Sequence, residues 1–398
     1  MKNSSSVDVS FTELIKSLMQ TDPAAAAACI KEYLEKKNNT PLNIAITGES
    51  GAGKSTFINY FREMTNNDEG AAPTGCTETT FESSPYPHPK YPNVVLWDLP
   101  GIGTTTFPAD EYLKKMGFEK FDFFIIISDT RFRENDVKLA KAIQKMEKKF
   151  YFVRSKIDSD LQNEKRGKNN FNEEETLKKI REYCIQGLQK EGFESPQVFL
   201  ISNFDLHLYD FPLLHETLDR ELPEHKRRAL LMAMPNINLE VINKKKESLQ
   251  SLIKYYAAAS AAGAAVPVPG LSIAVDSALI VQAVTTFVVS FGLDVKSLDK
   301  LADGTGVAAT DLIKEILSPL AAVEITPTLI LNFLGQLGSV VGLMAGEEVS
   351  RFIPVFGTFI AMGLSFAVTY KSLNHILDKL AEDAQRVFKR ALGLNSSV

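Results

Sequence analysis

From residue 41 to about residue 222, nearly continuous apolar runs alternate with segments in which apolar residues recur at helical spacing. Continuous apolar runs are typical of strands that are buried on both faces of a sheet. Strands that alternate with helices predict a mostly parallel sheet flanked by helices. The predicted fold class is therefore α/β, with strands at residues 42–47, 93–98, 121–128, 150–155 and 197–202.

Both ends of the chain lack this alternation and predict helices. In the N-terminal part, Ser10 is positioned to cap a first helix, and Pro23 lies in the first turn of a second helix over residues 24–37. Helical periodicity also extends from residue 226 onward. We expect an N-terminal helical segment, a central α/β domain and a C-terminal all-helical domain, at residues 1–40, 41–225 and 226–398.

Two long apolar stretches lie in the predicted helical domain. Residues 255–293 contain one charged residue, Asp276, and residues 352–370 contain none. The second stretch has the length of a membrane span, and a helix that is apolar all round is buried either in protein or in lipid. Because the mean hydropathy of the chain is -0.06, burial inside a helical bundle is the favoured interpretation. A transmembrane protein that uses both stretches is an alternative.

Residues 48–55 match the P-loop pattern G-x-x-x-x-G-K-[ST] at every position. They lie between the first predicted strand and a helix-like run, so backbone N–H groups converge at a helix N-terminus and favour an anion there. Such a loop cradles the phosphates of a nucleotide, while the lysine reaches the β- and γ-phosphates and the Ser55 hydroxyl binds Mg2+. The predicted phosphate-binding residues are Gly48, Glu49, Ser50, Gly51, Ala52, Gly53, Lys54, Ser55 and Thr56.

A second phosphate-sensing motif, D-x-x-G, ends the strand at residues 93–98. Asp98 is predicted to hold Mg2+ through water, and the N–H of Gly101 is available to a γ-phosphate. Between the two motifs, residues 70–80 form a threonine-rich loop of the kind that orders around a γ-phosphate. One of its threonines is expected to complete the Mg2+ shell, and the sequence leaves open whether this is Thr74, Thr77, Thr79 or Thr80.

A third motif, S-K-I-D at residues 155–158, follows the fourth strand and is close to [NT]-K-x-D. The carboxylate of Asp158 would accept hydrogen bonds from N1–H and the 2-amino group of guanine. Adenine offers no such pair, and sites of this kind discriminate by about 10^4. The stem of Lys156 would lie on the base, and Ser155 replaces the usual Asn or Thr. The last strand ends where a backbone N–H usually reads guanine O6, at Ser202 and Asn203. Together the motifs predict a Ras-like domain that binds GTP or GDP rather than ATP.

One group expected for catalysis is missing. Ras-like domains follow D-x-x-G with a glutamine that orients the attacking water, whereas this chain has Ile102. Either hydrolysis is slow, or Glu78 in the threonine-rich loop, a backbone carbonyl or a residue of a second protomer takes this role. Lys54 and Glu78 are the predicted catalytic residues, and Arg131 and Arg133 are expected at a solvent-exposed helix start.

Composition narrows the class of protein. The net charge of -5 and the absence of a basic stripe argue against nucleic-acid binding. The three cysteines are scattered and form no CxxC pair, so neither a zinc site nor a disulfide framework is expected. The first residues lack the apolar region of a signal peptide, and Lys2 stands where N-myristoylation requires glycine. We therefore expect a cytoplasmic protein.

Several long motifs resemble the immunity-related, or interferon-inducible, GTPases of vertebrates. They lie at residues 41–49, 86–90, 92–94, 97–105, 111–113, 122–128, 151–160 and 222–227. Lys54 matches the effector-type members of that family, and Ser155 departs from their usual threonine.

This resemblance implies a dynamin-like enzyme that hydrolyses GTP and dimerises or oligomerises through its nucleotide face, with itself or with related GTPases. It also implies action on the membranes of pathogen-containing vacuoles in innate immunity. Glu78 matches a family residue that takes part in hydrolysis, and Thr74 and Thr80 match positions open to inactivating phosphorylation. The implied location is the cytoplasm, with peripheral attachment to intracellular membranes.

Two other interpretations of the nucleotide-binding domain stay open. A regulatory GTP-binding module with little intrinsic turnover fits the missing glutamine. A septin- or GIMAP-type GTPase shares the P-loop and D-x-x-G motifs, although the large apolar helical C-terminal part argues against it.

Overall fold

The computed structural model describes residues 6–75, 83–100, 116–130, 132, 134–264, 271–326, 328–329, 333 and 360–394. The chain forms two compact units, one comprising Thr40–Asn238 and the other joining Met1–Asn39 to Leu239–Val398. The first unit extends past the predicted boundary at residue 225. The reason is that helix α9 (Glu224–Ala233) packs against strands β1 (Leu42–Thr47) and β3 (Val94–Asp98).

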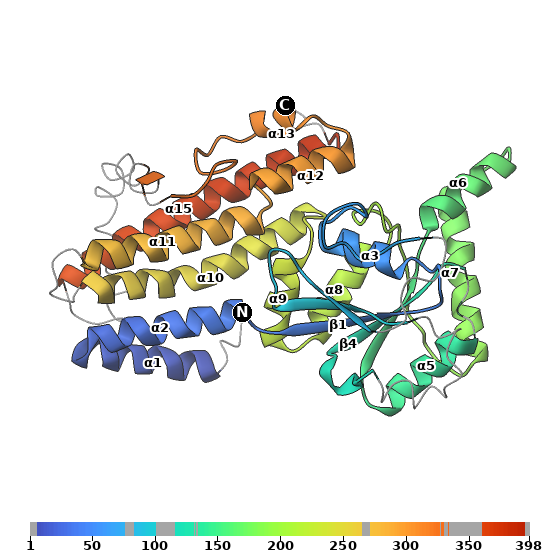
Figure 1. Cartoon of the computed structure of the whole chain (residues 1–398), viewed down its shortest axis with the longest axis horizontal. Coiled ribbons are helices and arrows are strands. Elements are labelled where there is room, and N and C mark those ends of the chain that lie inside the picture. Colours follow the sequence, from blue (N-terminus) through green and yellow to red (C-terminus); the bar gives the residue numbers. More distant parts are fainter. Residues whose placement is uncertain are drawn as a thin grey trace. The chain divides into compact units, whose positions relative to one another are not determined.

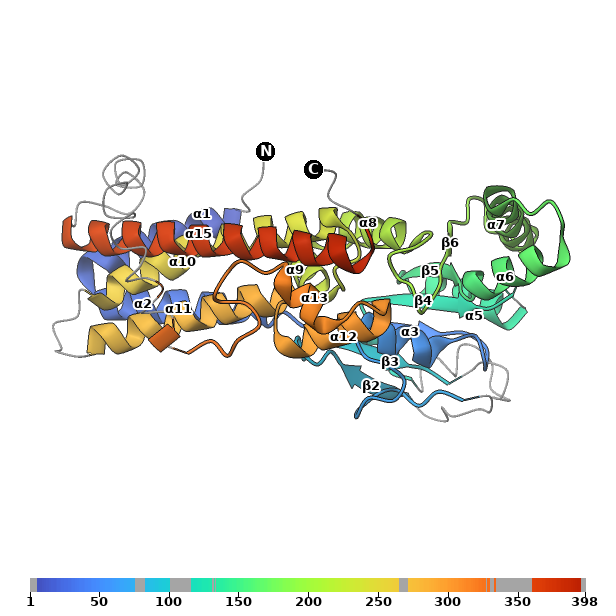
Figure 2. The same cartoon turned by 90° about the horizontal axis from the view of Figure 1, so that it is seen from above.

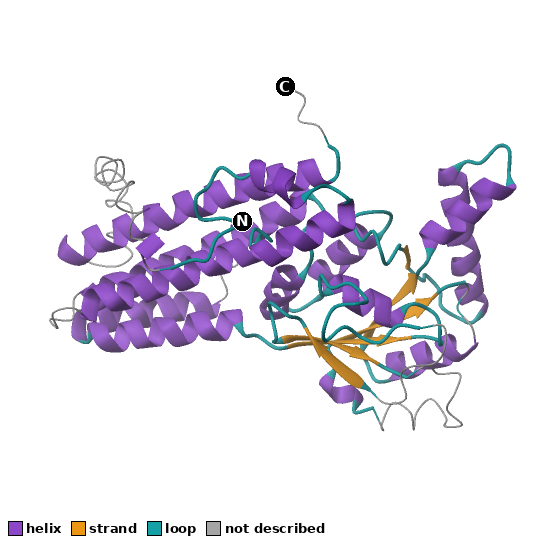
Figure 3. Cartoon of the chain, turned by 45° about the horizontal axis from the view of Figure 1, so that its top comes forward, coloured by secondary structure: helices purple, strands orange, loops and turns teal. Residues whose placement is uncertain are grey.

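The unit Thr40–Asn238 is built on a six-stranded sheet (Figures 1 and 3). Its other strands are β2 (Ser84–Pro87), β4 (Phe123–Ser128), β5 (Lys149–Arg154) and β6 (Val198–Leu200). The order is β2-β3-β1-β4-β5-β6, and only the pairing of β2 with β3 is antiparallel. Strand β2 was not predicted from the sequence, because its two prolines suit only a sheet edge. The mostly parallel sheet confirms the predicted α/β class.

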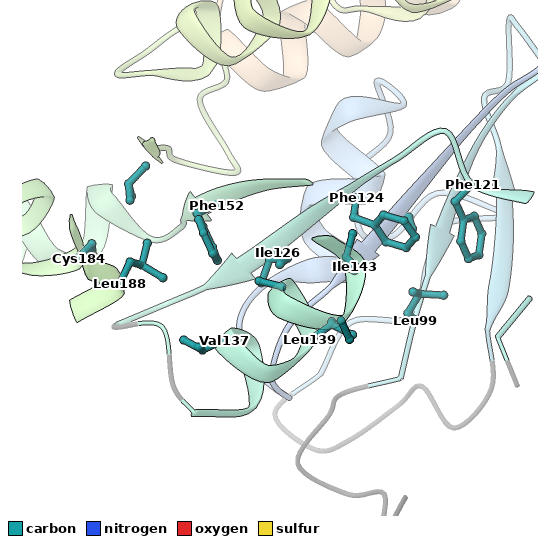
Figure 4. Close-up of a cluster of buried hydrophobic side chains, with 14 of the residues drawn as sticks. Leu99, Phe121, Phe124, Ile126, Val137, Leu139, Ile143, Phe152, Cys184 and Leu188 are labelled. Carbon is teal, nitrogen blue, oxygen red and sulfur yellow. The ribbon is translucent and has the colours of Figure 1, made fainter. Parts of the chain in front are cut away.

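Alternate residues of β4 point to opposite faces of the sheet, as strand geometry requires. On one face, Phe124 and Ile126 join a buried cluster with α5 (Glu134–Lys145) and α7 (Glu173–Lys190) (Figure 4). Phe57 and Phe61 of α3 (Lys54–Phe61) contact the ring of Phe211 in α8 (Phe211–Glu221) at centroid distances of 6.2 and 6.4 Å. The described residues of this unit also form a short 3-10 helix at Phe118–Lys120 and helix α6 (Ile157–Gly167).

The second unit is helical. Its long helices α10 (Leu239–Ala264) and α15 (Ile360–Ala391) run side by side, and α11 (Leu271–Ser290) packs on both (Figure 2). Among the described residues, α11 is followed by the short helices α12 (Val295–Thr305) and α13 (Ala309–Lys314). The N-terminal helices α1 (Ser6–Thr21) and α2 (Pro23–Asn38) complete the unit, because α2 packs along α10.

The ends of the N-terminal helices can be compared with the sequence prediction. Helix α2 has the predicted proline at its start, and Asp22 caps it by accepting a 3.1 Å hydrogen bond from Ala25 N. Helix α1 begins at Ser6, so the prediction that Ser10 caps it was wrong. The rings of Phe11 and Tyr33 stack at 4.1 Å, and Tyr33 lies 4.9 Å from Tyr255 of α10.

The apolar stretch at residues 255–293 contributes to the interior of the helical unit. The α10 side chains from Tyr255 to Ala262 are buried, and so are Ala283, Val284, Phe287 and Val288 of α11. Within the described part of the chain, one helical stretch, Ala278–Thr305, is long and apolar enough to cross a membrane, and 50% of its most apolar window is buried. Of residues 352–370, the first eight lie outside the described residues, and Phe366, Ala367 and Thr369 are buried.

Candidate nucleotide-binding site

The P-loop connects the carboxyl end of β1 to the N-terminus of α3, at the place where the strand order of the sheet reverses. Ligands of such sheets bind at this position. Two of its glycines have backbone angles that favour glycine, and a Cβ at either position would meet a neighbouring group. Gly48 has φ +138, and a Cβ there would lie 2.0 Å from Ile127 O. Gly53 has φ +91, and a Cβ there would lie 2.7 Å from Asn203 Nδ2. The loop can therefore approach a phosphate closely only with glycine at these positions.

Lys54, the first residue of α3, turns back over the loop. Its side chain is buried, and Nζ donates hydrogen bonds of 3.1 Å to Gly48 O and 3.0 Å to Glu49 O. The loop carbonyls thus hold the ammonium group beside the converging N–H groups. A phosphate bound in the loop would meet this positive charge together with the positive end of the α3 dipole.

Ser55 and Asp98 meet at the magnesium position that the sequence predicts. Ser55 Oγ donates a 2.7 Å hydrogen bond to Asp98 Oδ2, and Asp98 is fully buried at the end of β3. A hydroxyl and a carboxylate oxygen are donors that suit Mg2+, which usually takes one or two protein oxygens together with substrate phosphates and water. The residues present therefore fit a Mg2+ ion. Among the residues that the structure describes, no group of three or more His, Cys, Asp or Glu side chains could hold a metal by itself.

Residues 155–158, the base-recognition loop, are hydrogen-bonded to the P-loop. Ser155 is buried, and its Oγ donates a 2.7 Å hydrogen bond to Ala52 O and lies 3.3 Å from Ser128 O. The serine hydroxyl thus links this loop to the P-loop. Lys156 adopts the left-handed conformation, with φ +58, and its Nζ pairs with Asp129 Oδ2 at 2.9 Å.

Asp158 lies in the first turn of α6 and has an unsatisfied acceptor. Its Oδ1 is buried and has no hydrogen-bond partner among the described residues, while Oδ2 is 3.4 Å from Ser159 Oγ. Leaving a buried acceptor unpaired costs about 1–3 kcal/mol. An N1–H and 2-amino edge of guanine would supply the missing donors. The site therefore fits a guanine base.

Comparison with known proteins decides the family. The family description "Interferon-inducible GTPase (IIGP)" matches residues 9–391. The chain belongs to the interferon-inducible GTPase family. It is 43% identical to interferon-inducible GTPase 5 of Rattus norvegicus over 372 residues, which cover 93% of this chain and 80% of the relative. It is 39% identical to interferon-gamma-inducible GTPase 10 of Mus musculus over 384 residues, covering 96% and 89%.

A solved structure of an oligomerised bacterial dynamin pair aligns over 98% of this chain and 76% of that chain, with TM-score 0.36 and 11% identity. This likeness is too low to support a conclusion about function. The family membership confirms the resemblance drawn from the motifs and makes the chain a GTP-binding GTPase.

In this interferon-inducible GTPase, Asn203 has a role that the sequence did not predict. Its side chain is buried, and Nδ2 donates a 2.9 Å hydrogen bond to Gly53 O at the end of the P-loop. Ser202 Oγ and Asn203 Oδ1 are buried and have no hydrogen-bond partner among the described residues. The strand that was expected to read the base through a backbone N–H therefore also supports the P-loop through a side chain.

The base of the threonine-rich loop is held by α3, which the sequence reading also missed. Asn59 donates to Ala72 O at 2.9 Å and accepts from Ala72 N at 2.6 Å, so one amide pairs both backbone groups. Thr74, two residues further on, is exposed. The other predicted groups lie outside the described residues and stay predictions: Thr77, Glu78, Thr79, Thr80, Gly101, Ile102, Arg131 and Arg133.

Proposed function

We propose that this interferon-inducible GTPase is a switch whose GTP-bound state dimerises or oligomerises through its nucleotide face. Its target is an intracellular membrane, and its role is cell-autonomous innate immunity, including action on pathogen-containing vacuoles. The observation that carries the proposal is an imbalance within the site. The groups that bind nucleotide are present and are hydrogen-bonded to one another. The position after Gly101, which holds a water-orienting glutamine in Ras-like domains, is Ile102.

The chain's own residues divide the work of binding. Lys54 and the loop N–H groups hold the phosphates, and Asp158 selects guanine. Ser55 and Asp98 would hold Mg2+, joined by a threonine of the loop that contains Thr74. When bound, Mg2+ supplies positive charge that stabilises the transferring phosphoryl group.

Hydrolysis requires a group that orients water, and we assign this to Glu78 together with a second protomer. An apolar Ile102 cannot accept a hydrogen bond from water, so a monomer would turn over slowly. A second copy that docks on the nucleotide face would complete the site. Hydrolysis would then weaken the dimer and reset the switch.

Membrane attachment in this proposal is peripheral and from the cytoplasmic side. The helical stretch Ala278–Thr305, in which the most apolar window is 50% buried, is the segment of the helical unit that we assign to this attachment. Related GTPases of the same family are candidate partners, because they would present a similar nucleotide face.

The test is the initial GTP turnover per molecule, measured across a wide range of protein concentration. We expect the specific rate to rise with concentration, the ATP control to be inactive and Lys54→Ala to give a blank. A flat, near-zero rate with GTP still bound would overturn dimer activation and favour a regulatory module with little turnover. Equal rates with ATP would overturn the guanine assignment.

A further inference from the structure

Arg154, the last residue of β5, is a buried cation next to the base-recognition loop. Only 5% of the residue is exposed. Its guanidinium donates through Nη1 to Ser155 O and through Nη2 to the carboxylate of Asp160. One side chain thus ties the end of the strand to both sides of the loop that carries Lys156.

The contact with Asp160 fixes the rotation of the first turn of α6. Asp160 N donates a 3.1 Å hydrogen bond to Lys156 O, which closes that turn. Successive residues of an α-helix are about 100° apart, so side chains two positions apart point in nearly opposite directions. When Arg154 holds Asp160 on one side, Asp158 is directed to the other. The direction of the guanine-binding carboxylate therefore depends on the contact between Arg154 and Asp160.

Charge pairing around the loop leads to the same conclusion. The carboxylates of Asp129 and Asp158 lie close enough to Asp160 to raise its pKa. Asp129 is paired with Lys156, and Asp160 is paired with Arg154. No ion pair of Asp158 occurs among the described residues. Each of the other carboxylates has its own cation, and Asp158 is left for a neutral hydrogen-bond donor.

The Arg154–Asp160 pair has no simple stabilising explanation. Burial is the largest influence on Asp160 and raises its pKa, the charge of Arg154 opposes this, and Asp129 and Asp158 raise the pKa further. Because the net direction is upward, the surroundings disfavour the carboxylate form despite its partner. Ion pairs of this kind are weak evidence for stability, which points to a positional role.

We propose that Arg154 and Asp160 are positioning residues that set the guanine selectivity of the site by aiming Asp158. This rests on the assignment of Asp158 to the guanine base. Loss of the pair would let the first turn of α6 rotate, so that Asp158 would no longer meet N1–H and the 2-amino group together.

The test compares the dissociation constants of GDP and IDP, measured by calorimetry on the full chain. Hypoxanthine keeps N1–H but lacks the 2-amino group, so the IDP/GDP ratio reports the second hydrogen bond to Asp158. Asp160→Asn keeps the shape of the side chain and removes its charge. We expect this variant to lower the ratio of the IDP to the GDP dissociation constant about tenfold, because a hydrogen bond to a charged group contributes a free energy of that size.

Asp122→Asn is the matched control for stability. Asp122 pairs with Lys226 and accepts a 2.9 Å hydrogen bond from Asn43 N, at the amino ends of the strands and far from the base loop. Asp122→Asn should leave the IDP/GDP ratio of dissociation constants unchanged even if this variant lowers the melting temperature. Asp160→Glu, which keeps the charge on a longer arm, is the second variant if Asp160→Asn fails to fold. It should lower the ratio to a smaller extent.

The double variant Asp158→Asn/Asp160→Asn separates an indirect effect from a direct one. If Asp160 acts through Asp158, the double variant will have the same ratio as Asp158→Asn alone. If Asp158→Asn leaves the preference intact, the guanine assignment fails and the positioning role fails with it. If Asp158→Asn abolishes the preference but the Asp160 variants weaken GDP and IDP equally, only the positioning role is overturned.

Discussion

The hydroxyl of Ser55 donates a 2.7 Å hydrogen bond to a carboxylate oxygen of Asp98, so the start of α3 and the end of β3 meet at one point. Both oxygens suit Mg2+. We predict that Mg2+ strengthens GTP binding and that Ser55→Ala removes most of this gain, by about tenfold in affinity, because one metal ligand is lost. The measurement is the dissociation constant of GTP in Mg2+ and in EDTA.

The control for this prediction is Ser251→Ala. Ser251 is an α10 serine whose hydroxyl donates to Ser248 O at 2.7 Å. It should leave the ratio of the two constants at its wild-type value. Equal GTP affinity with Mg2+ and EDTA in the wild type would contradict the metal assignment of Ser55 and Asp98.

Gly53 provides a second prediction, because a Cβ there meets Asn203 Nδ2 at 2.7 Å. Gly53→Ala also forces a left-handed φ of +91 on a residue with a side chain. We expect a loss of unfolding free energy of about 1–3 kcal/mol from the strained backbone, together with a loss of GTP binding from the clash. Urea unfolding and a GTP titration measure the two effects.

The matched control is Gly192→Ala. Gly192 has φ +95, but a Cβ there would meet nothing within 4 Å. It should show a similar loss of stability with normal GTP binding. Gly53→Ala combined with Asn203→Ala should recover part of the binding, since the clashing amide is gone. Normal GTP binding by Gly53→Ala alone would show that the clash with Asn203 has no functional weight.

The nucleotide motifs could be predicted because each is continuous in the sequence. Residues 48–55 and Asp98 follow apolar strands, and the structure places them together at the carboxyl ends of neighbouring strands. The contacts between motifs could not be predicted. Ser155 Oγ bonds to Ala52 O across 103 positions, and Asn203 Nδ2 bonds to Gly53 O across 150. A single sequence shows no pattern that pairs residues so far apart.

The domain organisation shows the same limit. Helical periodicity predicted the N-terminal helices, but it identifies an apolar face and not the partner that covers it. The partner is α10, where Tyr255 meets Phe11 and Tyr33. Strand β2 was missed for a different reason. Pro85 and Pro87 argue against a strand in the sequence, but an edge strand tolerates proline.

Tyr151 supports a prediction about pH. Burial, and then the Glu221 carboxylate, raise its pKa above the ordinary value of 10.0. In the unfolded chain the phenol loses its proton near pH 10, whereas in the folded chain it keeps it. The folded state therefore binds more protons above pH 10, and stability falls as pH rises through this range. We expect Tyr151→Phe to flatten that fall in urea unfolding measured between pH 8 and about pH 11.

At neutral pH the same variant should be less stable by about 1 kcal/mol, because the 3.0 Å hydrogen bond from Tyr151 to Glu221 is lost. Tyr183→Phe, on the exposed surface of α7, controls for the removal of a phenol. A Tyr151→Phe variant whose stability declines with pH as steeply as the wild type would contradict this account.

Asp158 allows the nucleotide preference to be exchanged. Xanthine carries a carbonyl where guanine carries the 2-amino group, so an amide in place of the carboxylate can donate to it. We predict that Asp158→Asn loses at least about 100-fold in GTP affinity, since the guanine donors face an amide N–H, and gains affinity for XTP. Titration of the wild type and of Asp158→Asn with GTP and with XTP measures this exchange. Retention of wild-type GTP affinity would contradict the base assignment.

The exchanged preference also tests whether the partner must itself be in the triphosphate state. The wild type can be held at a concentration where its GTP turnover is low, and the Asp158→Asn variant added in excess. If the nucleotide faces of two triphosphate-bound protomers complete each other, wild-type GTP hydrolysis will rise only when XTP is also present. The variant without XTP, and XTP without the variant, are the controls. Stimulation by the variant alone would mean that the partner acts without its nucleotide, and no stimulation in any mixture would argue against a shared active site.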